Sequence, residues 1–143
     1  MPLTFWPTAC LGPRMPAVTT YRDLEAWQLG MRLAEGVYAL TRRLPQDERY
    51  GLTAQMRRAA IGIPSNVAEG QQQGFDRIYL RYVSMALGSE AELQTQLELV
   101  TRLQFVPAEH VQPVLELASR TGQVLRGLQR SLRRRSKDQR PKT

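Results

Sequence analysis

Apolar side chains recur every three or four residues through most of this 143-residue chain, which is the spacing of one face of an α-helix. A second apolar line occupies another side of the first such helix, predicted over residues 21–43. We expect the first line to face the core and the second to contact another molecule, because one line suffices for packing on a single core. The first line consists of Leu24, Trp27, Met31, Ala34, Tyr38 and Thr41, and the second of Leu29, Leu33 and Leu40.

Proline interrupts the second helical stretch, predicted over residues 52–70. Pro64 lacks the backbone donor that would bond the Ala60 carbonyl, a loss of about 3 kcal/mol unless neighbouring groups compensate. Ser65 and Asn66 can supply that compensation, because their side chains bond free backbone groups. We therefore expect the second helix to bend or end at Pro64.

A third helix is predicted over residues 75–104, and a fourth begins in the turn that holds Pro107. The third carries its apolar stripe at Phe75, Tyr79, Tyr82, Ala86, Leu93, Leu97 and Val100, with Leu80, Leu87, Met85 and Leu99 off the stripe. The fourth continues the period at Val111, Val114, Leu115, Ala118, Leu125, Leu128 and Leu132.

No segment alternates apolar and polar residues as a strand does, so the chain is predicted to be all-α. Four helices joined by short connections favour an up-down-up-down antiparallel four-helix bundle, here with a kinked second helix. The spare apolar positions on the first and third helices predict a homo-oligomer, because a monomer would expose them.

The predicted bundle spans residues 21–133. Residues 1–20 are rich in proline and lack a helical period, and we expect a disordered leader there. Thr20 and Asp23 have the spacing of a helix start. Residues 134–143 are expected to form a basic disordered tail.

Positive charge is concentrated at the end of the chain. Residues 126–143 carry a net charge of +7, equal to that of the whole chain, so the other residues are neutral overall. Two cations would suffice to complement a helix dipole, whereas a cluster of this size is typical of proteins that bind nucleic acid or anionic surfaces. The candidate phosphate-binding residues there are Arg126, Arg130, Arg133, Arg134, Arg135, Lys137, Arg140 and Lys142.

Four separated motifs occur in the order found in one known family. They lie at residues 23–28 (DLEAWQ), 49–53 (RYGLT), 57–70 (RRAAIGIPSNVAEG) and 86–99 (ALGSEAELQTQLEL). In these motifs the chain resembles the four-helix-bundle family of the 23S ribosomal RNA intervening-sequence proteins. A related member, the accessory variability protein of diversity-generating retroelements, resembles these proteins in fold and works beside a reverse transcriptase. The resemblance implies a ring-like homopentamer with a central opening, and it makes a reverse transcriptase a candidate protein partner.

The recurrent polar positions of that family include Arg57 and Arg58. In one interpretation these side chains only fix the packing, with an arginine paired to Glu69 or Glu92. In the other, Arg57 or Arg58 stays unpaired and contacts phosphate, which a guanidinium binds in a bidentate manner. The remaining recurrent positions are Ser65, Asn66, Ser89 and Gln96.

The sequence favours neither a catalytic nor a cofactor site. A di-iron centre in a helical bundle needs Glu-x-x-His pairs, but His110, the single histidine, directly follows Glu109. Cys10, the single cysteine, lies in the leader, away from a basic partner. We expect no enzyme activity, no cofactor and no metal. No apolar run is long enough to cross a membrane, and a cytoplasmic location is expected.

The sequence thus predicts a non-enzymatic homo-oligomeric bundle that binds RNA or DNA through backbone charge, with a role as accessory scaffold for a nucleic-acid enzyme as one option. The alternative is a protein-interaction or structural assembly protein with no nucleic-acid role. Phosphate binding would weaken steeply with salt, and an apolar protein contact would not.

Overall fold

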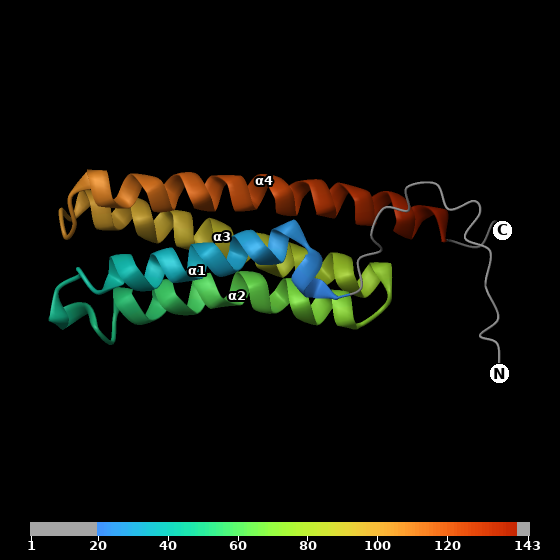
Figure 1. The fold of residues 1–143 in the computed structure, drawn as a ribbon, viewed down its shortest axis with the longest axis horizontal. Helices are drawn as coiled ribbons and strands as arrows, with labels where there is room; N and C mark the ends of the chain where they lie inside the picture. The colour runs from blue at the N-terminus through green and yellow to red at the C-terminus, as the bar shows by residue number, and fades with distance from the viewer. Residues whose placement is uncertain (1–19, 140–143) are drawn as a thin grey trace, which may run out of the picture.

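The computed structural model describes residues 20–139, which are all-helical and contain no strand (Figure 1). Four long helices run up-down-up-down, and two short 3-10 turns precede the first and second of them. The helices are α1 (Glu25–Thr41), α2 (Leu52–Gln72), α3 (Asp76–Arg102) and α4 (Ala108–Asp138), and the turns are η1 (Tyr21–Asp23) and η2 (Gln46–Glu48).

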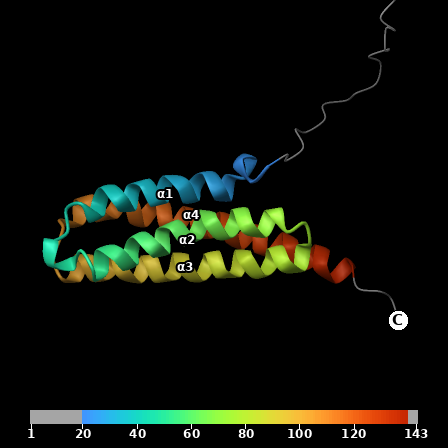
Figure 2. The same ribbon diagram turned by 90° about the horizontal axis from the view of Figure 1, so that it is seen from below.

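Each helix has two helical neighbours. α1 and α3 both pack against α2 and α4, whereas α2 and α4 lie on a diagonal and do not contact each other. The α1–α2 and α3–α4 connections share one end of the bundle (Figures 1 and 2). At the other end, the last turns of α4 extend beyond the α2–α3 connection.

The predicted start at Thr20 is confirmed, although the first turn is not α-helical. The Thr20 side-chain oxygen accepts a hydrogen bond from the Arg22 amide at 3.2 Å, and the Thr20 amide donates to the Asp23 carboxylate at 3.2 Å. This capping box closes η1. Leu24 then adopts an extended backbone, so α1 begins at Glu25 rather than at residue 21.

α2 continues through Pro64 to Gln72, so the proline does not end the helix. Pro64 is buried against α1, where a Cβ added to Gly30 would lie 3.3 Å from its ring atoms. Asn66 bonds the backbone as expected, but its side-chain amide donates to the Gly62 carbonyl at 2.7 Å rather than to Ala60. Ser65 remains exposed.

The assignment of the two faces of α1 was wrong. The line expected to contact another molecule, Leu29, Leu33 and Leu40, is buried in the core at 4% exposure or less. The line expected in the core lies at its edge: Thr41 is buried, Met31 is 38% exposed, and the other members, Leu24, Trp27, Ala34 and Tyr38, are half-buried. Both lines have the helical period, so spacing alone does not distinguish them. The inward line also carries Gly30, which lets α2 approach closely.

The stripes on α3 and α4 pack as predicted except at Phe75, which precedes α3 and is 68% exposed. Leu80 and Leu87 rest half-buried against the core, whereas Met85 and Leu99 are 51% and 43% exposed. The buried members of the two stripes are Tyr79, Ala86, Leu93, Leu97, Val100, Val111, Val114, Ala118, Leu125 and Leu132.

α4 extends further than the sequence indicated. A disordered tail was expected from residue 134, but the helix runs to Asp138. Leu132 is fully buried, and two side chains of the following turns, Arg135 and Gln139, are bonded to Asp76 of α3. These contacts hold the extra turns on the bundle. The predicted leader, apart from Thr20, and residues 140–143 lie outside the described part of the chain.

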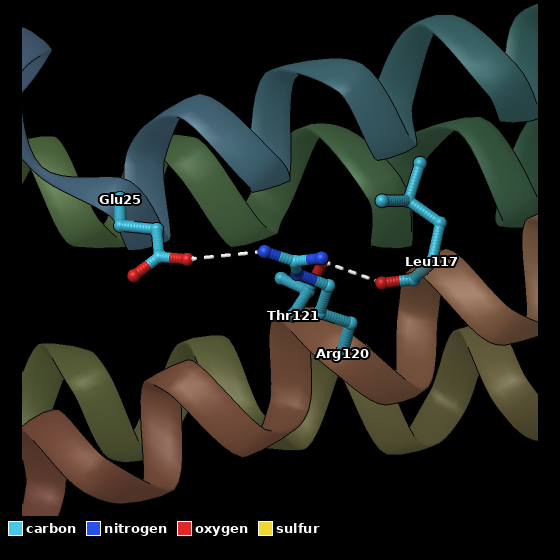
Figure 3. A network of polar contacts seen from close by, with 4 residues as sticks. All are labelled: Glu25, Leu117, Arg120 and Thr121. Carbon is cyan, nitrogen blue, oxygen red and sulfur yellow. Dashed lines mark hydrogen bonds and ion pairs between the residues drawn. The ribbon is translucent and has the colours of Figure 1, made fainter.

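Packing holds α1 on α4, with little help from polar contacts. Figure 3 shows Arg120 of α4 reaching Glu25 of α1 at 3.6 Å, but both side chains are mostly exposed, and such pairs contribute about 0–1 kcal/mol. Thr121 is fully buried, and its hydroxyl donates to the Leu117 carbonyl of its own helix at 2.7 Å. The Thr121 hydroxyl is thereby satisfied within α4.

Gly70 marks a close approach of α2 to α3 and yields a stability prediction. A Cβ there would lie 2.7 Å from Tyr82 Cβ and 2.8 Å from Tyr79 Cδ2. Gly70→Ala should lower the free energy of unfolding by about 1–3 kcal/mol, because the crowded atoms are close to the α3 backbone. The matched control is Gly88→Ala, which has open space within 4 Å and should raise stability by about 0.5–1 kcal/mol. Urea denaturation measures both, and equal effects would contradict the packing argument.

Candidate nucleic-acid interface

The second half of α4 presents a line of cations. Arg126, Arg130, Arg133 and Lys137 follow one another at spacings of three or four residues, so they share one side of the helix. All four are exposed or half-exposed, and the neighbouring Arg134 is exposed. Of the other predicted residues, Arg140 and Lys142 lie outside the described part of the chain.

A groove between the start of α3 and the end of α4 adjoins this line. It has a volume of about 330 Å³ and is lined by Arg77, Leu80, Arg133, Ser136 and Lys137. The sequence analysis did not select Arg77. The antiparallel pairing of α3 and α4 could have indicated it, because that pairing places the first turn of α3 beside the last turns of α4.

Asp76 fixes the relative positions of the two helices at this groove. Its carboxylate forms an ion pair with Arg135 Nη2 at 3.2 Å and accepts a hydrogen bond from the Gln139 side chain at 3.0 Å. Asp76 is only 20% exposed, so this pair is better shielded from solvent than the Glu25 pair. Arg135 was a predicted phosphate contact, but in the structure its charge is engaged by Asp76.

The phenol of Tyr79 lies near Arg135. Burial raises the pKa of Tyr79 to about 12, and the positive charge of Arg135 lowers it in part. The hydroxyl is buried, and no hydrogen-bond partner for it lies among the described residues. Tyr79 therefore stays neutral at physiological pH, and Asp76 is the group that balances Arg135.

Arg57 belongs to a different environment. Its Nε donates to the buried Thr41 hydroxyl at 2.9 Å, and its guanidinium lies 4.5 Å from the centre of the Tyr38 ring. These contacts join α2 to α1. Within residues 20–139, ion pairs form between Arg120 and Glu25, between Arg135 and Asp76, and between His110 and Glu109, so neither Glu69 nor Glu92 pairs with an arginine.

The predicted basic residues thus fall into two separate groups. Arg57 and Arg58 lie in the first half of α2, the helix diagonal to α4. That half of α2 is near the α1–α2 connection, whereas the α4 cations lie toward the opposite end of the bundle (Figure 1). The structure therefore does not bring Arg57 and Arg58 together with the α4 line.

The outward line of α1 forms an apolar surface with α2, hereafter the α1–α2 surface. It contains two adjoining hollows of about 430 and 340 Å³ that share Met31, Ala34 and Ile61. Ile61 is 44% exposed, Tyr38 lines the larger hollow, and Trp27 lines the smaller one. Sequence reasoning missed this surface because it assigned the same line to the core.

Glu90 is the other residue whose position the sequence did not indicate. Its side chain is buried between α3 and α4, where a Cβ added to Gly122 would lie 2.9 Å from the carboxyl carbon. The Gln94 side chain donates a hydrogen bond to it. Glu92 is exposed, so the two carboxylates do not form an acid-base pair.

No group of histidine, cysteine, aspartate and glutamate in the described part of the chain could hold a metal ion.

The sequence profile of the 23S rRNA-intervening sequence proteins matches residues 22–127 of the chain. The chain belongs to this family. The matched region covers the first three helices and most of α4, so the basic line from Arg130 onward lies beyond it. No match was found among curated proteins.

A solved structure supports the fold of this intervening-sequence protein. It is a protein of unknown function from the S23 ribosomal protein family of Bacteroides thetaiotaomicron VPI-5482. The two chains superpose with a TM-score of 0.68 at 17% sequence identity, over 73% of this chain and 97% of the other. Within residues 20–139, no helix is both long and apolar enough to cross a bilayer.

Asp76→Ala tests whether Asp76 holds the end of α4. The substitution removes the carboxylate that binds both Arg135 and Gln139, so amide hydrogen exchange in the last two turns of α4 should accelerate. The control is Glu25→Ala, which removes an exposed pair and should leave exchange in α4 unchanged. Unaltered exchange after Asp76→Ala would show that packing at Leu132 alone holds these turns.

Proposed function

We propose that this intervening-sequence protein is a non-enzymatic homo-oligomer that binds RNA or DNA through backbone phosphates, as an accessory scaffold for a nucleic-acid enzyme. The observation that carries the proposal is the cation line of α4, held on an ordered helix beside Arg77 of α3. A cytoplasmic location is part of the proposal.

Order in the basic segment matters for binding. Cations on a helix anchored by Leu132 and Asp76 keep a fixed spacing, so less conformational entropy is lost when they meet phosphates. Each phosphate that they neutralise releases condensed counterions, which is the main source of sequence-independent affinity. In a homo-oligomer, several copies of the line would act together on one strand.

The α1–α2 surface supports the oligomeric part of the proposal. Exposed apolar area of this kind is typical of contacts between proteins. Met85 and Leu99 on α3 are exposed on another helix, and two different complementary surfaces can join copies head to tail into a closed ring. The resemblance to the family supports five copies.

A protein-interaction role is the second candidate, and the α1–α2 surface is the observation that favours it. In this case the surface would receive a different protein, and the α4 cations would only favour solubility. A reverse transcriptase is one candidate partner, on the resemblance in fold between this family and the retroelement accessory variability protein.

The phosphate proposal predicts a salt-dependent affinity that rests on α4. Replacing Arg126, Arg130, Arg133 and Lys137 by Gln should weaken binding to a fluorescent RNA or DNA and flatten the dependence on salt. The logarithmic slope should fall by about 0.7–0.9 for each phosphate that the variant no longer neutralises. Fluorescence anisotropy across a salt series measures this.

The matched control replaces four exposed arginines outside this line, Arg32, Arg43, Arg49 and Arg102, by Gln. It removes the same charge and should leave most of the affinity and slope. Equal reductions of affinity in the two variants would indicate that the overall positive charge of the protein, rather than the α4 line, attracts the nucleic acid. Absence of binding at low salt by the unaltered protein would leave the protein-interaction role.

The oligomer proposal predicts that Met31→Glu with Ile61→Glu separates the copies. Both positions are exposed in the protomer, so helicity should be retained while charge prevents apolar contact. Light scattering should show the unaltered protein at a multiple of the 16.3 kDa chain and the variant at the mass of one chain. Tyr50→Glu, at an 87% exposed position outside this surface, is the control and should not change the mass.

A further inference from the structure

We propose that the α3–α4 groove binds a phosphate monoester, the terminal phosphate of a nucleic-acid strand. The proposal rests on the proposed function and specifies which phosphate this part of the protein selects. It assigns to Arg77, Arg133 and Lys137 a role that the other α4 cations do not share, because these three line one cavity.

Charge favours a terminal phosphate over an internal one. Two guanidinium groups and one ammonium group line the groove, and no carboxylate lines it. An internal phosphodiester carries one negative charge, whereas a phosphate monoester carries about −1.5 to −2 at neutral pH. Three cationic residues around one groove therefore match the monoester better, and charge-assisted hydrogen bonds to its three free oxygens are among the strongest in proteins.

The rest of the groove suits a nucleotide. Its volume of about 330 Å³ falls in the range of small-molecule sites. Leu80 supplies an apolar contact for a sugar or base edge. Ser136 also lines the groove, and its buried hydroxyl has no hydrogen-bond partner among the described residues, so it is free to bond a ligand oxygen.

The acid that adjoins Arg77 in the sequence is engaged outside the groove. Asp76 precedes Arg77 in α3, but its carboxylate is engaged by Arg135 and Gln139. The charge of this adjacent acid is therefore already balanced by Arg135. The same contacts hold α3 and α4 together, so the two helices that carry the cations are positioned before a ligand arrives, which limits the entropic cost of binding.

The test compares single strands of one sequence that differ only at the end. Full-length protein is titrated against fluorescent RNA that carries a 5′-phosphate, a 3′-phosphate or only hydroxyl ends. We expect a terminal phosphate to tighten binding about tenfold, a size typical of charge-assisted hydrogen bonds. Arg77→Gln should abolish this preference.

Arg81→Gln is the matched control. Arg81 lies one turn after Arg77 on the same helix, is exposed, and does not line the groove. It should keep the full preference for a terminal phosphate, even if general affinity falls. Equal effects of the two variants on the preference would overturn the assignment of the groove.

Competition with adenosine monophosphate distinguishes the source of the phosphate. If the free nucleotide displaces the phosphorylated strand at equal concentration, the groove binds the monoester alone and the strand-end assignment is overturned. Salt-dependent binding of all strands without preference would overturn this inference but leave the proposed function in place. Binding of the nucleotide without binding of strands would overturn both the strand-end assignment and the proposed function.

Discussion

The pairing of α3 with α4 positions the basic end of the chain. Asp76 contacts Arg135 at one point along the pair, and Ser84 accepts a hydrogen bond from Gln129 further along it. Glu90 packs against Gly122 beyond that. These contacts set one register between the helices, and that register places Arg77, Arg133 and Lys137 around one groove. Without it, the α4 cations would form a cluster with no shaped site.

Burial of the aliphatic line of α1 determines which side chains of that helix are left for the α1–α2 surface. Once Leu29, Leu33 and Leu40 fill the core, Met31 of the same helix is left exposed and Trp27 and Tyr38 are half-buried at its edge. There Met31 joins Ile61 of α2 in one apolar surface. The two candidate surfaces therefore lie on different helix pairs. The apolar surface of α1 and α2 and the groove of α3 and α4 share no lining residue, so the two proposed activities do not compete for the same side chains.

Arg57 illustrates how a conspicuous charge can serve structure. The motif around it is part of what marks the family, yet its guanidinium bonds Thr41 and lies over Tyr38. Its partners come from the end of α1, so its charge helps to join two helices far from the α4 line. Arg77, which no motif marked, lines the candidate site because a neighbouring helix brings cations to it.

The sequence by itself determined the helical class, the four helices within a few residues of their bounds, the capping residues Thr20 and Asp23, and the concentration of cations near the end. These features depend on local spacing and composition, which the chain carries directly. The tertiary structure decided which line of α1 is buried, that α4 stays helical to Asp138, and that Arg77 meets Arg133 and Lys137. The physical reason is that helical period is the same for an inward and an outward face. Only contacts between helices, such as those of Gly30 with α2 and Asp76 with α4, distinguish the two.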